Sequence, residues 1–306
     1  MKAAIDIGTN TVLLLIGEVE NGLLNVIHEG YRIPRLGKGV DAKRKLHSDS
    51  VDRVLVVLRE YKSIIDEKYP DCEEIIITAT SAVRDAENRD DFLQIVKNEL
   101  GVKVKLLSGD DEAVYTYQGA LATLSGPQKE SFVILDIGGG STEIAAGNSK
   151  NVSIFTSVDM GCVRFTERFL VHNPPYQEEI YHCKEAIQEL LAKNKLKLPR
   201  KVKAVGVAGT MTSLAAINMQ VTDADFDLFN GMVIDTAALS NSIDIFRLHT
   251  HDQLLELSPE VMKGREDIFL AGLLILEGFL KYYKLSEIVV STGGIRHGVL
   301  LMSEKE

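Results

Sequence analysis

The sequence predicts an α/β protein built from two duplicated halves, and two observations predict this class. The opening stretch AIDIGTNTVLLLIG, residues 4–17, matches the stretch ILDIGGGSTEIAAG, residues 134–147, at a constant offset of 130 residues. Apolar runs typical of strands also alternate along the chain with segments of helical periodicity. Each half is therefore expected to form a sheet covered by helices.

The elements of the first half follow from this pattern in order. The half begins with a strand that carries Asp-Ile-Gly and turns into a second strand. Residues 49–68 then form a helix, because apolar side chains recur there at helical spacing. A strand at 76–83 ends in a Thr/Ser-rich turn, where the same offset places Thr80 on Thr210. Three more elements complete this half: a helix at 89–100, a strand at 102–107 and a helix at 110–124.

The second half repeats the opening strands and then departs from the repeat. Its strand EIVVSTGG, residues 287–294, comes about 54 residues later than the offset predicts, so this half carries a mostly helical insertion. Pro174, Pro175 and Pro199 break the half into separate helices. The loop-like segment 124–130 is the expected division between the halves. Helices are expected at 177–193, 235–247 and 265–283.

Composition limits the partners of this protein. The chain has 34 Lys and Arg against 44 Asp and Glu, and its net charge of −10 repels DNA and RNA. An anionic ligand would therefore need a few local arginines and backbone N–H groups. The three cysteines show no CxxC spacing, which argues against a disulfide framework and a thiolate zinc site and fits a reducing cytoplasm.

Neither export nor membrane anchoring is expected. Asp6 comes too early for the apolar region of a secretion signal. The longest apolar helix candidate, residues 268–283, is interrupted by Glu277 and Lys281, so it is expected to be a core helix. We therefore expect a cytoplasmic protein that binds neither nucleic acid nor membrane.

Asp6 and Asp136 occupy equivalent turns of the repeat. Paired α/β halves that meet edge to edge form a cleft, and both turns would face it. Two carboxylates there suit a divalent cation that is held together with phosphate oxygens. The alternative is that each Asp only caps its own turn. Glu143 either faces solvent or serves the cleft, because a carboxylate in an apolar core would be costly.

Three consecutive glycines, residues 138–140, follow the strand that carries Asp136. Such a backbone can bring its N–H groups close to an anion, or it can form only a tight hairpin. Arginines in or beside polar turns favour the first interpretation, because a guanidinium group and backbone amides together bind phosphate. These arginines are Arg35, Arg84, Arg164, Arg265 and Arg296.

The segment LSGDDEAVYTYQGA ends a strand and opens a helix with three acids, Asp110, Asp111 and Glu112. Acids stabilise a helix N-terminus through the helix dipole, and any of the three could do so. A general base could also be among them. Spacing alone does not select one.

Eight motifs occur in one order along the chain: DIGTNT, RLGKGV, ATSAVRDAEN, LSGDDEA, DIGGGSTEI, GCVRFTE, GVAGTMTSLAAI and STGGIRHGVLL. Together they resemble the exopolyphosphatase/guanosine pentaphosphate phosphatase family of the actin, sugar-kinase and heat-shock-chaperone ATPase superfamily. The resemblance implies two actin-like domains of ribonuclease-H topology, with the active site in a cleft between them. It places the first domain at residues 1–124 with a returning C-terminal helix at 296–306, and the second at 125–295.

The resemblance also implies roles for individual residues. Glu112 matches the general base that activates water, and Asp136 and Glu143 match carboxylates that bind Mg²⁺ or another divalent cation. Arg35 and Arg265 are candidates for contacts to the distal part of the ligand. Phosphate-binding positions fall on both halves: Asp6, Thr9, Asn10, Thr11, Arg84, Gly138, Gly139, Gly140, Ser141 and Thr210.

The activity implied by the resemblance is hydrolysis of a terminal phosphoanhydride bond, in inorganic polyphosphate, in guanosine pentaphosphate or in both. It connects the protein with the stringent response and leaves a homodimer open. Longer family members carry a further C-terminal helical domain that holds extended polyphosphate, so short polyphosphate or guanosine pentaphosphate is expected here. Two alternatives remain: a small-molecule phosphotransferase of the same superfamily, and a regulator that binds guanosine tetraphosphate without turnover.

Overall fold

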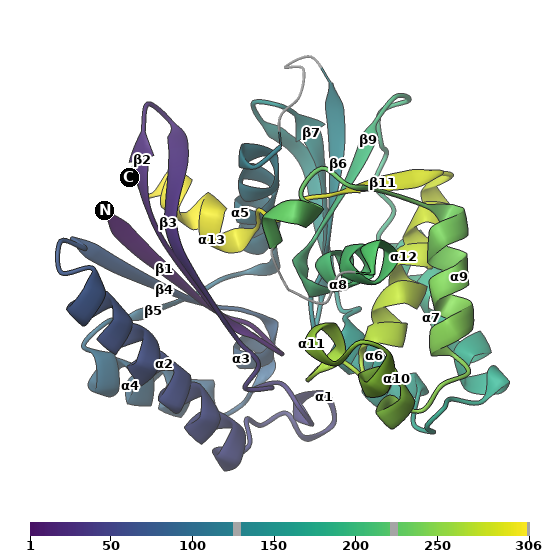
Figure 1. The fold of residues 1–306 in the computed structure, drawn as a ribbon, viewed down its shortest axis with the longest axis horizontal. Coiled ribbons are helices and arrows are strands. Elements are labelled where there is room, and N and C mark those ends of the chain that lie inside the picture. Colours follow the sequence, from purple (N-terminus) through teal and green to yellow (C-terminus); the bar gives the residue numbers. More distant parts are fainter. Residues whose placement is uncertain (125–129, 221–225, 305–306) are drawn as a thin grey trace. The chain divides into compact units, whose positions relative to one another are not determined.

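The computed structural model describes residues 1–124, 130–220 and 226–304. The chain divides into two compact units (Figure 1). Unit 1 consists of Met1–Ala122 and Gly293–Glu306, and unit 2 of Thr123–Thr292. Each unit contains one mixed sheet with helices, so the predicted α/β class with two halves is confirmed. Most of the expected dividing loop, residues 124–130, lies outside the described residues.

Unit 1 is built on a five-stranded sheet with the strand order β3-β2-β1-β4-β5. Strand β1 is antiparallel to β2 and parallel to β4, and β4 is parallel to β5. The strands are β1 (Lys2–Ile7), β2 (Val12–Glu20), β3 (Leu23–Arg32), β4 (Glu74–Ala79) and β5 (Val104–Leu106). The helices are α1 (Val40–Lys43), α2 (Ser48–Lys68), α3 (Ser81–Asp85), α4 (Arg89–Leu100), α5 (Gly109–Ala122) and α13 (Ile295–Met302).

Helix α2 covers one face of this sheet, as its apolar spacing predicts. Its side chains Val54, Leu58 and Tyr61 are fully buried. The Tyr61 hydroxyl donates to the Val12 carbonyl oxygen at 3.0 Å, which ties the helix to β2. Gly30 lies under the same ring, and a Cβ there would come within 2.9 Å of it, so only glycine allows this approach.

Helix α13 returns to unit 1 and packs against α5 through glycines. A Cβ on Gly119 would lie 2.0 Å from the Gly294 carbonyl oxygen, and a Cβ on Gly298 would lie 2.0 Å from that of Tyr115. The two helix backbones therefore approach more closely than side chains would allow. Val299 and Leu300 close this contact over the sheet, in a small core separate from the one beneath α2.

Unit 2 is built on a six-stranded sheet with the strand order β10-β11-β9-β6-β7-β8. Its core lies between this sheet and a buried helix, α12. The strands are β6 (Ser131–Ile137), β7 (Thr142–Asn148), β8 (Val152–Val158), β9 (Lys203–Val207), β10 (Val233–Asp235) and β11 (Glu287–Val290). The helices are α6 (Cys162–Phe169), α7 (Gln177–Lys193), α8 (Ala208–Met219), α9 (Thr236–Phe246), α10 (His251–Leu257), α11 (Pro259–Met262) and α12 (Phe269–Tyr283), with a short 3-10 turn at Phe226–Phe229.

The helical insertion predicted for the second half is confirmed, because five of the described α-helices and the short edge strand β10 lie between β9 and β11. Helix α12 begins at Phe269 and not at residue 265 as expected, since Arg265 lies in the turn that precedes it. Helix α8 was not expected, because it is buried on nearly all sides and so has no apolar stripe. None of the helices among the described residues combines the length and apolar character needed to cross a bilayer.

Candidate active site

Two turns at equivalent places in the repeat carry many of the predicted residues. We call them the first turn, Gly8–Thr11 between β1 and β2, and the second turn, Gly138–Ser141 between β6 and β7. In the first turn the Gly8 N–H donates to the Thr11 carbonyl oxygen at 2.9 Å. In the second turn the Gly138 N–H donates to the Ser141 carbonyl oxygen at 3.0 Å. The duplication therefore extends to the backbone of the turns.

The first turn is fixed by the loop that follows β3. The Arg35 N–H donates to the Asn10 carbonyl oxygen at 3.0 Å, and the Gly37 N–H donates to that of Thr9 at 2.7 Å. Arg35 adopts a positive φ of 56°, so its backbone turns sharply to make this contact. The structure thus gives Arg35 a backbone role beside the turn.

Asp6 lies one residue before the end of β1, and its carboxyl group is largely buried. The Thr78 hydroxyl on the neighbouring strand β4 donates to Asp6 Oδ1 at 3.0 Å. Two residues after Thr78, where α3 begins, the Thr80 N–H donates to the Ile7 carbonyl oxygen at 3.2 Å. These bonds hold the end of β1 against the start of α3.

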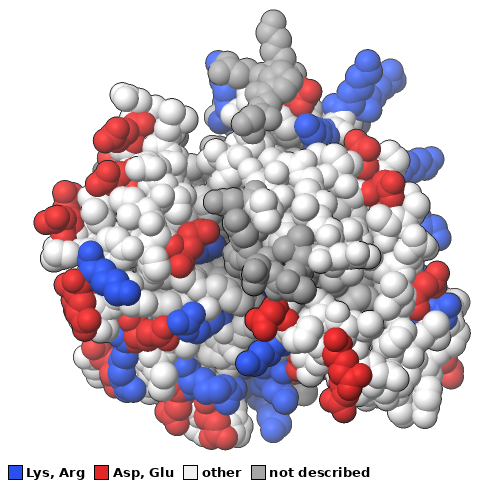
Figure 2. Space-filling model, viewed as in Figure 1, with Lys and Arg blue, Asp and Glu red and all other residues white. Residues whose placement is uncertain are grey.

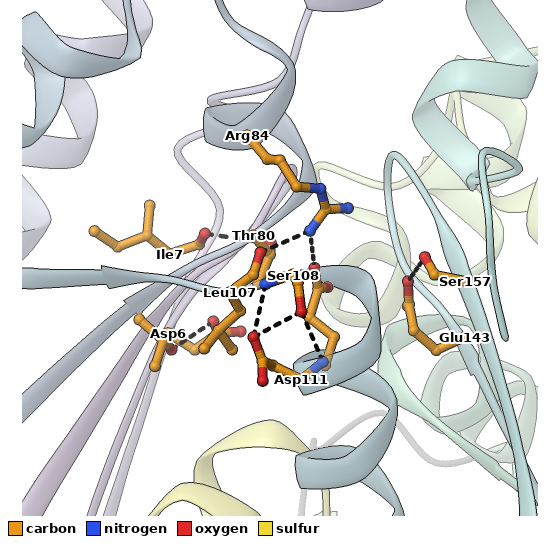
Figure 3. A network of polar contacts seen from close by, with 11 residues as sticks. Asp6, Ile7, Thr80, Arg84, Leu107, Ser108, Asp111, Glu143 and Ser157 are labelled. Atoms are coloured by element: carbon orange, nitrogen blue, oxygen red, sulfur yellow. Dashed lines mark hydrogen bonds and ion pairs between the residues drawn. The ribbon is translucent and has the colours of Figure 1, made fainter. Parts of the chain in front are cut away.

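Glu112 lies in the first turn of α5 and is 3% exposed. Arg84 comes from α3, and its Nη1 donates both to Glu112 Oε1 and to the Leu107 carbonyl oxygen, the latter at 2.9 Å (Figure 3). The arginine side chain is 24% exposed, so an anion in solvent can reach it. A buried carboxylate beside a reachable guanidinium group is an arrangement suited to phosphate chemistry.

The structure separates the three acids that spacing could not distinguish. Asp111 completes the cap that Ser108 forms at the start of α5: Asp111 Oδ2 accepts from the Ser108 hydroxyl at 2.7 Å and from the Ser108 N–H at 3.1 Å (Figure 3). Asp110 is exposed. Glu112 is the buried member of the three and the one in contact with Arg84.

The second turn is fixed by the first turn of α6. The N–H groups of Cys162 and Val163 donate to the carbonyl oxygens of Gly138 and Gly139, both at 2.9 Å. The buried Arg164 donates its Nε to the Gly140 carbonyl oxygen at 2.6 Å. All three glycine carbonyls therefore point toward α6.

This orientation determines where the N–H groups of the second turn point. In a trans peptide the C=O and the following N–H point in opposite directions, so the N–H groups of Gly139, Gly140 and Ser141 point away from α6. No hydrogen bond from the N–H of Gly139 or Gly140 is found within the described part of the chain. N–H groups that point together to one side are what the phosphate interpretation requires, and a plain hairpin does not require them.

A close backbone approach completes the second turn. A Cβ on Gly161 would lie 2.4 Å from the carbonyl carbon and oxygen of Gly139 and 2.5 Å from the Gly140 nitrogen. Cys162 follows it, and burial raises the pKa of its thiol to about 11. The thiol therefore stays protonated at neutral pH and is not a nucleophile.

Asp136 and Glu143 are direct neighbours across β6 and β7. Both are buried, at 7% and 3% exposure, and the Ser157 hydroxyl on β8 donates to Glu143 Oε1 at 2.7 Å (Figure 3). Like charges directly opposite one another destabilise a sheet, so a cation between them would be favourable. Mg²⁺ in proteins is usually bound by one or two carboxylates together with water and phosphate oxygens, so this pair fits that ion by its chemistry. The residues described include no cluster of three or more His, Cys, Asp or Glu side chains suited to a metal.

A second buried arginine supports the beginning of α8, which directly follows β9. Arg265 Nη1 donates to the Gly209 carbonyl oxygen and to the Ser213 hydroxyl, the latter at 2.7 Å. Thr210, the predicted phosphate contact, is buried in the first turn of α8. The contacts found for Arg265 go into the protein, so its contact with a ligand remains a prediction.

The offset of the repeat changes along the chain. In β1 and β4 Asp6 pairs with Thr78, whereas in β6 and β9 Asp136 pairs with Val207. The offset is therefore 129 at the second parallel strand, and by strand register Thr80 corresponds to Gly209 and not to Thr210. The alignment of the two halves by sequence, which placed Thr80 on Thr210, was therefore wrong by one residue here.

The predicted site residues thus fall into two groups. Unit 1 holds one set, in or beside the first turn and α5: Asp6, Thr9, Asn10, Thr11, Arg35, Arg84 and Glu112. Unit 2 holds the other, in or beside the second turn and α8: Asp136, Gly138, Gly139, Gly140, Ser141, Glu143, Thr210 and Arg265.

Sequence reasoning missed several contacts in the site. Thr78 and Ser157 gave no signal, because single hydroxyl residues in strands are common, and only the strand register brings them to the carboxylates. Arg164 was noticed as one cation among five, but its place at the Gly140 carbonyl depends on the fold. Arg296 is also structural: its side chain is half-buried, ion-paired with Glu29 at 3.3 Å, and donates to the Leu14 carbonyl oxygen at 2.5 Å.

Known proteins resemble this chain over almost its whole length. The model of the Ppx/GppA phosphatase family matches residues 15–306. A protein named Exopolyphosphatase 2 from Mycobacterium tuberculosis is 32% identical, over 98% of this chain and 97% of its own length. A bifunctional 3-dehydroquinate synthase/phosphatase from Fusobacterium nucleatum is 30% identical over 98% of this chain, which corresponds to only 46% of that protein.

Solved structures show the same fold. The crystal structure of the Ppx/GppA family member from Aquifex aeolicus superposes with a TM-score of 0.82 at 31% sequence identity. The match covers 99% of this chain and 97% of that one.

Proposed function

Because the chain belongs to the Ppx/GppA phosphatase family, we propose that it is a phosphoanhydride hydrolase that releases terminal phosphate from inorganic polyphosphate. The observation that carries this proposal is the buried Glu112 in contact with Arg84. Hydrolysis without a covalent intermediate requires one placed base and a group that neutralises phosphate charge, and this pair supplies both. The name of the Mycobacterium tuberculosis relative supports polyphosphate as the substrate.

Each group of site residues has its own task in this proposal. In unit 1, Glu112 accepts a proton from water, and the water oxygen forms a bond to the terminal phosphorus. The bridging P–O bond then breaks, and the shortened chain leaves as a phosphate anion. Arg84 neutralises charge on the phosphoryl oxygens, which bear most of the charge in the transition state.

In unit 2, the N–H groups of the second turn bind phosphate oxygens. Asp136 and Glu143 hold a divalent cation, Mg²⁺ by the chemistry of their oxygens. When bound there, the cation would supply neutralisation of phosphate charge and polarisation of a phosphoryl oxygen. Arg164 and the first turn of α6 keep the glycine carbonyls turned away from the anion, so the ligand meets only donors.

Replacement of the base tests this function. Glu112→Gln keeps the shape and loses the proton acceptor, so phosphate release from polyphosphate should fall by about 100-fold or more, while binding of tripolyphosphate stays within about twofold. The matched control is Asp110→Asn in the same helix turn, which should keep the activity. Equal turnover by Glu112→Gln and the parent chain would reject the assignment.

The same assay separates the alternatives. Released phosphate should be measured from tripolyphosphate, long-chain polyphosphate and guanosine pentaphosphate, each with Mg²⁺ and with EDTA. A preference for guanosine pentaphosphate would identify this nucleotide as the substrate and would support a part in the stringent response. Phosphate transferred from ATP to a small acceptor would indicate a kinase, and tight binding without release would indicate a regulator.

A further inference from the structure

One segment of unit 2 carries a concentrated positive charge that the proposed site does not use. Residues 193–203, which join α7 to β9, are called the basic segment here. We propose that the basic segment is a second anion-binding surface, which docks the far part of a long polyphosphate chain while the chain end is at the turns. The choice of polyphosphate as occupant rests on the function proposed above.

The charge of the basic segment contrasts with that of the whole chain. Its eleven residues contain no acid and six of the 34 Lys and Arg, in a protein of net charge −10. All six side chains are exposed: Lys193, Lys195, Lys197, Arg200, Lys201 and Lys203. A local field of this kind attracts a polyanion at short range, although the protein as a whole repels it.

These six cations are not neutralised by the protein. Some exposed cations elsewhere pair with nearby carboxylates, as Arg32 does with Glu60 and Arg59 with Glu99. Within the part of the chain that the structure describes, no cation of the basic segment makes an ion pair. Their charge is therefore available to an external ligand.

The basic segment is also held in place, so its cations are presented on one side. Leu196, Leu198 and Val202 lie between the cations and pack against the core of unit 2. The Leu196 N–H donates to the Tyr283 hydroxyl at 3.1 Å. Alternation of anchored apolar residues with cations turns Lys195 and Lys197 to solvent. In Figure 2, Lys and Arg side chains project from the upper right, where β9 begins.

The basic segment is distinct from the second turn. Strands β6 and β9 are parallel, with Phe132 opposite Lys203 at one end and Asp136 opposite Val207 at the other. The segment therefore lies at the strand end opposite the turn, and five strand residues separate them by roughly 13 Å. Only a chain of many phosphates reaches both places, and a chain bound at two places gains affinity from its effective concentration.

The composition of the basic segment favours polyphosphate over nucleic acid. Surfaces that bind single-stranded nucleic acid combine cations with aromatic side chains on which bases stack. The basic segment has no aromatic residue. The basic segment offers only positive charge, and an inorganic phosphate polymer offers only negative charge, so the two match.

The test is the binding of long-chain polyphosphate to the full-length Glu112→Gln protein, which removes turnover from the measurement. In this background, Lys195→Gln, Lys197→Gln, Arg200→Gln and Lys201→Gln are combined. We expect affinity for long-chain polyphosphate to fall at least about tenfold, and the slope of log Kd against log salt to decrease by about 3, at 0.7 per lost contact. The affinity for tripolyphosphate should not change.

A matched control separates local binding from net charge. Lys43→Gln, Lys45→Gln, Lys68→Gln and Lys97→Gln remove the same charge from exposed positions of unit 1. This control should keep the affinity for long-chain polyphosphate within about twofold, because scattered charges are screened within a Debye length.

Three outcomes would overturn the proposal: an unchanged salt slope in the first variant, an equal loss in the control, and equally tight segment-dependent binding of single-stranded RNA. The last would assign the surface to nucleic acid. A different result separates this inference from the proposed function. If long-chain polyphosphate binds through the basic segment but the parent chain releases no phosphate, the proposed hydrolase is rejected and this inference stands.

Discussion

The first and second turns share one backbone design and differ in the side chains around it. Both close with the same glycine N–H bond, and both have their carbonyls held by a later segment. The residue across the strand pair differs: Asp6 faces Leu13, whereas Asp136 faces Glu143. Only the second turn therefore places two carboxylates side by side. The fold thus provides the same turn twice, and the cation of the proposed function is assigned to the turn that has two carboxylates.

The way each turn is held also differs. Backbone N–H groups of a loop, at Arg35 and Gly37, hold the first turn. The second turn is held by a helix N-terminus and a buried guanidinium group, from Arg164. A helix start and a charged donor are stiffer supports than a loop. In the proposed function, the second turn is thus the more preorganised of the two turns.

The largest expected effect comes from making the second turn like the first. Glu143→Leu removes one of the two neighbouring carboxylates, so Mg²⁺-dependent phosphate release should fall by about 100-fold or more. The same variant should be more stable than the parent chain in EDTA, by about 0.2–1 kcal/mol, because a like-charge pair is gone. Titration of activity with Mg²⁺ and denaturation in EDTA measure the two effects.

A milder change provides the control for this prediction. Ser157→Ala removes the hydroxyl that donates to Glu143 and keeps both carboxylates. It should weaken metal affinity by only about tenfold. Normal Mg²⁺ dependence in Glu143→Leu would show that the cation is held elsewhere.

The supports of the two turns can be compared with a single added methyl group. Gly161→Ala places a Cβ against the backbone of Gly139 and Gly140, and Gly37→Ala places one against the Thr9 side chain at 2.2 Å. A backbone segment moves aside for an added methyl group less easily than a side chain does. Gly161→Ala should therefore lower the free energy of unfolding by about 1–3 kcal/mol, and Gly37→Ala should lower it by less. Chemical denaturation gives both values, and the opposite order would mean that the second turn is the looser one.

The smallest expected effect comes from making the first turn like the second. Leu13→Glu puts a carboxylate opposite Asp6 and should destabilise the protein by about 0.2–1 kcal/mol in EDTA. Mg²⁺ should recover part of this loss if two neighbouring carboxylates are enough to bind the cation. Thermal denaturation with and without Mg²⁺ measures it, and an equal loss in both would mean that the second turn supplies more than its carboxylates.

Periodicity and the repeat predicted the α/β halves and the long helices, but not the buried or short elements. Amphipathic helices such as α2 and α7 show one apolar face in the sequence. Helix α8 has no such face, and β10 has only three residues, so neither carries a periodic signal. The cleft expected between the halves and the exact domain limits remain predictions.

The site could be predicted in part. The pairing of Asp136 with Glu143 depends on a four-residue turn and the resulting register, which the residues alone did not reveal. Asp111 and Glu112 are adjacent acids in sequence, and only the Ser108 cap and the Arg84 contact distinguish them. Side-chain burial is set by tertiary packing, so it could not be read from spacing.

The return of α13 to unit 1 has a consequence for how the chain is made. Unit 2 is one continuous stretch, Thr123–Thr292, whereas unit 1 needs residues from both sides of that stretch. During synthesis on the ribosome, unit 2 can therefore acquire its structure while α5 still lacks the helix that its glycines contact. Unit 1 is completed only after α13 leaves the exit tunnel, so the helix that carries Glu112 is secured later than the residues of unit 2 are synthesised.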